Sequence, residues 1–133
     1  MNELEEIKIE NLIYEIRGKQ VMLDSDLAKL YGCKNGTKDI NKAVNRNIDR
    51  FPQDFYFQLN KVEFENLKFQ NGTSNINNHG GVRKLPHVFT EEGVAMLATV
   101  LKTENASSVS IKIMRTFVAM RHFINENKEY LKD

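Results

Sequence analysis

One segment, residues 37–50, constrains the fold of this chain more than any other. Its apolar residues Ile40, Val44 and Ile48 recur every four positions, and Ala43 widens the stripe. Because residues four apart lie on the same side of an α-helix, this spacing predicts a helix with one apolar face. Such a face is normally buried against other elements. The segment therefore predicts a helix that packs on the core of a small domain.

The opposite face of this helix is basic and rich in amides. It carries Lys38, Asn41, Lys42, Asn45, Arg46 and Asp49, and Arg50 follows at its end. Lysine and arginine neutralise phosphates, and an asparagine side chain offers a donor and an acceptor together to a base edge. These residue types favour a helix that faces nucleic acid. An ordinary solvated amphipathic helix is the alternative.

Positive charge is concentrated around this segment. From Arg17 to Arg50 the chain has eight Lys or Arg and four Asp, a net charge of +4, whereas the whole chain carries only +1. No Glu occurs between Gly18 and Asn60. A basic patch in a nearly neutral protein indicates nucleic-acid binding through one face and excludes a uniformly basic surface.

Length and composition predict one globular domain. The chain has 133 residues, of which 41% are hydrophobic and 28% charged. Its longest apolar run is far shorter than a membrane span, and its acidic N-terminus is unlike a secretory signal. The single cysteine, Cys33, gives no disulfide framework. We therefore expect a cytoplasmic protein without a membrane contact.

The N-terminal half predicts a hairpin followed by two helices. Beta-branched and apolar residues on both sides of Gly18 predict a hairpin within residues 12–23. A short helix is expected over residues 26–31, capped by Asp24 or Ser25 and ended by Gly32. The helix of residues 37–50, with Thr37 as its cap, would then form a helix-turn-helix-like pair with it.

The C-terminal half predicts two strands and three helices. A strand is expected from Phe55, and Asn60 with Glu63 forms a capping box that opens a helix reaching about Phe69. Residues 70–81 predict a long loop. Residues 85–89 predict a second strand, which Pro86 places at a sheet edge or at the strand's start.

Two helices are expected to complete the chain. Thr90 caps the first, and the second is long, covering about residues 105–128. Together these elements predict a small α+β domain with a short antiparallel sheet or hairpins. Its seven apolar-patterned phenylalanines are expected in the core rather than as base-stacking platforms: Phe55, Phe57, Phe64, Phe69, Phe89, Phe117 and Phe123.

No pattern in the sequence calls for an enzyme. The three histidines are widely spaced, so neither a metal site nor another cofactor is expected. The carboxylate pairs Asp24 with Asp26 and Glu91 with Glu92 lie at predicted helix starts, where capping and the helix dipole favour acidic residues. We interpret all four as structural.

The order of several motifs resembles the KilA-N-like DNA-binding domains of phage and prophage proteins. The closest type is the ORF-six N-terminal domain, which is found in phage antirepressors. The matching residues lie within about residues 12–122: Ile16–Gly32, Asn41, Ala43–Val44, Arg46–Ile48, Arg50–Pro52, Asp54–Phe55, Phe57–Leu59, Gly80–Pro86, Phe89–Leu97, Ile113–Arg115, Phe117–Val118 and Arg121.

This resemblance implies an α+β domain that binds double-stranded DNA. It places the domain at residues 12–124, with an N-terminal extension at 1–11 and a helix end or linker at 125–133. The expected DNA-binding residues are those of the basic helix face, Lys38, Asn41, Lys42, Asn45, Arg46 and Arg50, together with Arg83 and Lys84. For Arg83 and Lys84, the alternative is that they are ordinary surface cations without a DNA contact.

A second function class is a protein-interaction module. An antirepressor captures a repressor protein, and the long C-terminal helix has enough apolar surface to support a homodimer. Packing of that helix on its own domain is the alternative.

Overall fold

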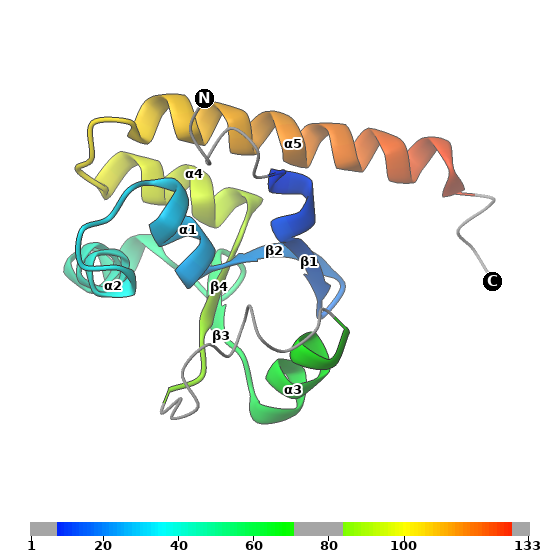
Figure 1. Ribbon diagram of the computed structural model, residues 1–133, viewed down its shortest axis with the longest axis horizontal. Coiled ribbons are helices and arrows are strands. Elements are labelled where there is room, and N and C mark those ends of the chain that lie inside the picture. Colours follow the sequence, from blue (N-terminus) through cyan, green and yellow to red (C-terminus); the bar gives the residue numbers. More distant parts are fainter. Residues whose placement is uncertain (1–7, 71–83, 129–133) are drawn as a thin grey trace.

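A computed structural model of the chain describes residues 8–70 and 84–128 (Figure 1). The predicted loop at 70–81 lies almost wholly outside these residues, as does Arg83. The fold is α+β, as predicted: a four-stranded antiparallel sheet with helices on both faces and a long C-terminal helix.

The sheet is built around the predicted hairpin. Strand β1, Ile13–Ile16, pairs antiparallel with β2, Lys19–Leu23. The two turn residues, Arg17 and Gly18, both have positive φ, 57° and 73°. Positive φ at both central positions is typical of the tight turn whose twist suits a two-residue hairpin. The hairpin prediction is therefore confirmed.

The strand at His87–Thr90, β4, lies in the interior of the sheet. It pairs with β2 on one side and with β3, Tyr56–Gln58, on the other, giving the order β1-β2-β4-β3. The edge position that Pro86 suggested is wrong, and the alternative of a strand start is right. Pro86 precedes the strand, and its carbonyl accepts from the Leu59 N–H at 2.9 Å.

Helices cover both faces of the sheet (Figure 1). Helix α3, Lys61–Gln70, lies on one face, where Phe64 and Leu67 join Val21 and Leu23 in one buried cluster. The other face carries four helices: α1, Asp24–Leu30; α2, Thr37–Arg46; α4, Glu91–Val100; and α5, Ala106–Glu126. These four helices contribute to a second, larger core cluster, to which Met22 also belongs. Met22 lies between Val21 and Leu23 in β2, and successive strand residues point to opposite faces.

Short 3₁₀ turns connect to this helical layer. Turn η2, Ile9–Leu12, precedes β1, and both of its terminal residues pack against the larger core cluster. Turn η3, Ile48–Arg50, follows α2.

The domain bounds expected from the sequence, residues 12–124, stay a prediction.

Two helix starts differ from the sequence prediction. Helix α1 begins at Asp24 with Leu23 as its N-cap, so neither Asp24 nor Ser25 caps it. The Asp24 carboxylate instead accepts from the backbone N–H of Ser25 at 2.8 Å and of His87 at 3.2 Å, which ties α1 to β4. Helix α2 has Gly36, at φ 63°, as its N-cap, and Thr37 makes no cap hydrogen bond.

The other capping predictions are confirmed. Gly32 follows α1 with a φ of 68°, a conformation that ends helices. Asn60 Oδ1 accepts from Glu63 N at 2.7 Å, and Glu63 Oε1 accepts from Asn60 N at 2.8 Å. Thr90 Oγ1 accepts from Gly93 N at 3.2 Å at the start of α4.

Two of the phenylalanines expected in the core are exposed. Phe69 is 88% exposed in the last turn of α3, and Phe123 is 59% exposed near the end of α5. Helix α3 buries Phe64 and Leu67, so Phe69 points away from the sheet. Phe123 is in the last turn of α5, and that end of the helix extends past the rest of the fold in Figure 1. Burial predicted from residue type fails at helix ends that have nothing to pack on.

Gly93 allows α4 to approach the sheet, and we predict that Gly93→Ala destabilises the protein. A Cβ there would overlap the backbone oxygen of Phe55, which already accepts from Thr90 N at 3.0 Å. In an open helix, alanine in place of glycine would stabilise by about 1 kcal/mol. We expect instead a loss of roughly 2 kcal/mol or more in the free energy of unfolding, measured by urea denaturation.

Ala95→Gly is the control, because Ala95 is exposed in the same helix. It should cost only about 1 kcal/mol. A Gly93→Ala variant as stable as the parent would contradict this account of the contact.

Candidate nucleic-acid interface

Helix α2 ends at Arg46, four residues before the predicted end. Asn47 leaves helical geometry, with φ −132° and ψ 38°, and its side-chain Nδ2 donates to the Ala43 carbonyl at 2.8 Å. That amide thus satisfies a carbonyl that the next turn of the helix would otherwise have used. Turn η3 then carries the chain to Arg50, and Ile48 is 54% exposed rather than part of the buried stripe.

The remaining apolar stripe of α2 orients the helix. Ile40 and Val44 are fully buried and belong to the same core cluster as Leu97 and Leu101 of the α4 region. This packing turns one flank of α2 toward the connection between α4 and α5. The basic residues on that flank are exposed to solvent and lie beside a second segment of the chain.

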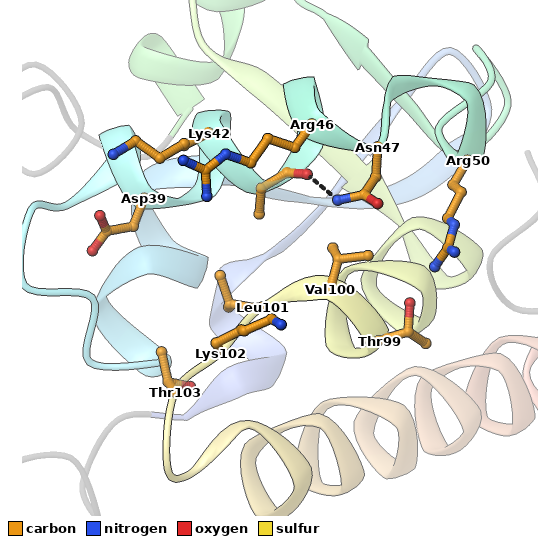
Figure 2. Close-up of a pocket in the computed structure, with 11 residues that line it drawn as sticks. Asp39, Lys42, Arg46, Asn47, Arg50, Thr99, Val100, Leu101, Lys102 and Thr103 are labelled. Carbon is orange, nitrogen blue, oxygen red and sulfur yellow. Dashed lines mark hydrogen bonds between the residues drawn. The ribbon is translucent and has the colours of Figure 1, made fainter.

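Three of the predicted DNA-binding residues line one groove. Lys42, Arg46 and Arg50 lie along a hollow of about 630 Å³ whose other wall is formed by residues 99–103. Figure 2 shows Lys42 and Arg46 projecting from α2, Arg50 beyond the helix end, and Lys102 on the opposite side of the hollow. The groove thus brings four cations together, with Asp39 as its one carboxylate.

The other predicted residues lie elsewhere on α2. Asn41 is half-buried on the opposite flank, where it lines a hollow of about 220 Å³ together with Asp24 and Lys84. Lys38 and Asn45 are exposed and line neither hollow. One helix therefore presents a cation-lined flank, an exposed ridge and an amide-bearing flank that meets β4.

The cations of the groove form no salt bridge within the described residues, although the charge of Lys42 acts on the Asp39 carboxylate. Within residues 8–70 and 84–128, none of Lys42, Arg46, Arg50 and Lys102 forms a salt bridge. The Asp39 carboxylate accepts from the backbone N–H of Asn35 at 3.1 Å and from its side chain at 3.2 Å. These bonds, helped by the charge of Lys42, lower the pKa of Asp39, so it stays ionised.

Not all the positive charge of residues 17–50 belongs to this surface. Arg17 binds Glu63 of α3 with its Nε 2.7 Å from Oε2, and its guanidinium lies 4.2 Å from the centre of the Phe57 ring. It is thus on the other face of the sheet. The sequence count of +4 overstated how much charge gathers at α2.

Of the four cations in the groove described above, Lys102 is the one that the sequence did not predict as a DNA-binding residue. It lies just after α4, with no charge cluster or periodic pattern around it. Only the packing of α4 against α2 brings it opposite Arg46. No local signal could have identified it.

The acidic pair at the start of α1 is buried by the fold. Burial raises the pKa of Asp24, against the effect of its backbone hydrogen bonds. Burial raises the pKa of Asp26 to about 6, and its Oδ2 has no hydrogen-bond partner within the described part of the chain. A structural role stays our interpretation of both.

The described residues contain neither a cluster of metal ligands nor a helix suited to span a membrane. Among the described residues, no three His, Cys, Asp or Glu side chains gather as a metal site would need. No described helix combines the length and apolarity that crossing a membrane requires. The expectations of no cofactor and no enzymatic activity stay predictions.

Helix α5 keeps several apolar side chains in solvent. Ile111, Val118, Phe123 and Ile124 are 38–59% exposed, while Ile113 and Phe117 are buried in the domain. Packing of α5 on its own domain therefore accounts for one face of the helix. Self-association through its other face, and capture of a repressor, stay predictions.

Comparison with known families identifies the chain. Residues 11–100, about two-thirds of the sequence, match the model of the ORF6N domain. The chain belongs to the ORF6N domain family. This confirms the resemblance drawn from the sequence motifs, and membership of this phage-type family indicates a phage-associated regulatory function. Comparison with curated proteins and with solved structures gives no match.

The matched part of this ORF6N domain contains the whole of α2 and ends at the last residue of α4. Lys102 and α5 lie beyond it. The groove is therefore lined partly by the matched region and partly by the segment that follows.

Burial of Asp26 predicts a pH-dependent stability, which Asp26→Asn should remove. Because the folded-state pKa of about 6 exceeds the ordinary value near 4, the folded state favours the neutral carboxyl. The stabilisation of the folded state by the neutral carboxyl is fully present below pH 4 and is lost as the pH rises through 6. We expect Asp26→Asn to be more stable than the parent by roughly 2 kcal/mol at pH 8, with the difference vanishing near pH 4.

Urea denaturation across this pH range measures the difference. Asp49→Asn is the control, because it makes the same substitution at an exposed position. An advantage of Asp26→Asn that does not change with pH would contradict the assignment.

Proposed function

We propose that this ORF6N domain binds double-stranded DNA through α2, as part of a phage-derived transcriptional regulator or antirepressor. The observation that carries the proposal is the groove in which Lys42, Arg46, Arg50 and Lys102 gather without a salt bridge among the described residues. Four cations gathered beside a single carboxylate, Asp39, repel one another. A polyanion would relieve that repulsion, and phosphate contacts supply most of the affinity of DNA-binding proteins.

The neighbouring ridge of α2 supports a role in reading bases. Lys38 and Asn45 are exposed beside the groove, and an asparagine can bind an adenine edge through two hydrogen bonds. Asn41 is half-buried on the far flank, so its access to a base is narrower. Lys84 lines the same hollow as Asn41 and suits a backbone contact on that side. Arg83 lies outside the described residues.

The helix pair supports the same proposal. Helices α1 and α2 are joined by residues 31–36, and α2 presents its polar side away from the core. A second helix exposed in this way is how helix-turn-helix proteins enter the major groove.

We predict that Lys42→Ala/Arg46→Ala weakens the salt dependence of DNA binding. Each phosphate contact contributes about 0.9 to the slope of log affinity against log salt. Loss of two contacts should therefore reduce that slope by roughly two. Fluorescence anisotropy with a random-sequence duplex over a salt series measures it.

Lys112→Ala/Arg115→Ala is the matched control, since both residues are exposed on α5 and line none of the hollows around α2. It removes the same charge and should leave the slope close to that of the parent. Equal slopes for the two double variants would exclude α2 as the DNA-facing element. No binding by the parent at low salt would overturn the proposed function.

Asn45→Ala tests base reading separately. We predict that it reduces the ratio of affinities for a duplex selected by the parent and a random duplex by about tenfold, because one bidentate contact is worth about 1–3 kcal/mol of discrimination. Its salt slope should not change, since no phosphate contact is lost. Asn66→Ala on the exposed face of α3 is the control and should keep the full ratio.

A further inference from the structure

The connection between α4 and α5 is anchored at both of its ends. Leu101 is buried and its N–H donates to the Leu97 carbonyl at 2.9 Å, and Ala106 is buried at the other end. Between them, Thr103 Oγ1 donates to Asn105 Oδ1 at 3.1 Å. Lys102 is exposed within this short, anchored segment. Its amine is therefore presented from a backbone that is ordered by both neighbouring helices.

Lys102 separates two hollows that together form a longer track. The groove beside Arg46 shares Asp39, Lys102 and Thr103 with a second hollow of about 610 Å³, which is lined further by residues 31–35. The shared residues place the two hollows next to each other, on either side of Lys102. Together they run beside α2, whose ten residues span about 15 Å. Each strand of a duplex has one phosphate per 3.4 Å of helix axis, so a track of that length parallel to the axis would pass about four phosphates.

The charges along this track fit a phosphate chain. Its lining adds Lys34 and Glu104 to the four cations and Asp39 already described, so five cations face two carboxylates. A single small anion would engage only part of such a row. A chain of regularly spaced phosphates engages all of it.

The lining also distinguishes duplex from single-stranded nucleic acid. Proteins that bind single strands offer exposed aromatic rings on which bases stack. Among residues 8–70 and 84–128, Tyr31 is the one aromatic residue that lines either hollow. It is 1% exposed, and its hydroxyl lies 2.6 Å from Ser110 Oγ in the core. The track thus offers charge without a stacking platform, which suits the outside of a duplex.

We infer that the α4–α5 connection is the second wall of the DNA interface and that Lys102 binds a backbone phosphate of the strand held by Lys42 and Arg46. This inference rests on the proposed function and adds a contact from outside the region that matches the family. Lys102 supplies affinity and register, and Asn45 on the exposed ridge of α2 supplies discrimination. Loss of Lys102 then lowers the affinity for all duplexes by the same factor.

The experiment is anisotropy binding of the full chain to a random-sequence duplex over a salt series. It compares the parent with Lys102→Ala and with Lys112→Ala as the charge-matched control on α5. We expect Lys102→Ala to lower the salt slope by about one and the affinity by roughly fivefold at 0.15 M salt. It should lower the affinity for a selected duplex by the same factor. Thermal unfolding of each variant should match the parent, because Lys102 is exposed.

The outcomes separate this inference from the proposed function. If the parent binds, Lys42→Ala/Arg46→Ala flattens the slope and Lys102→Ala behaves like Lys112→Ala, the second wall is overturned and the proposed function stands. If the parent does not bind duplex DNA at low salt, both are overturned. Equal affinity of the parent for a single-stranded oligonucleotide of the same sequence would overturn the assignment of the track to a duplex.

Discussion

The burial of Ile40 and Val44 in the same core cluster as Leu97 and Leu101 is the interaction on which the candidate interface depends. It determines how α2 is rotated about its axis and how close the end of α4 lies to it. A helix turned by one residue, about 100°, would present a different set of side chains to the α4–α5 connection. The position of the groove is thus a consequence of apolar packing, although every side chain proposed to work there is polar.

The same rotation divides the polar surface of α2 into parts with different chemistry. The flank of Lys42 and Arg46 faces the connection, and the flank of Asn41 faces β4 and the small hollow that Asp24 lines. The cations are thereby separated from the half-buried amide of Asn41. In DNA-binding proteins, phosphate contacts set position and base contacts set specificity. A helix whose flanks differ in this way can assign the two tasks to separate residues.

The sequence predicted best what depends on neighbours within a few residues. The turn at Gly18 and the reciprocal cap of Asn60 and Glu63 are local arrangements, and both are confirmed. The end of α2 was missed, because the apolar spacing continues through Ile48 while the Asn47 side chain takes the Ala43 carbonyl. The sequence left open whether Pro86 marks a sheet edge or a strand start, because the interior position of β4 depends on its pairing with β2, which is distant in the chain.

The amino-acid sequence by itself determined that this chain forms an α+β domain with an amphipathic, basic helix, and its motifs are sufficient to identify the family. Periodicity, caps and turns are properties of short stretches, so they can be read without a fold. Only the tertiary structure decided that Arg17 pairs with Glu63 away from α2 and that Lys102 faces Arg46 across a groove. Those arrangements join residues far apart in the chain, and only the packing of helices on the sheet brings them together.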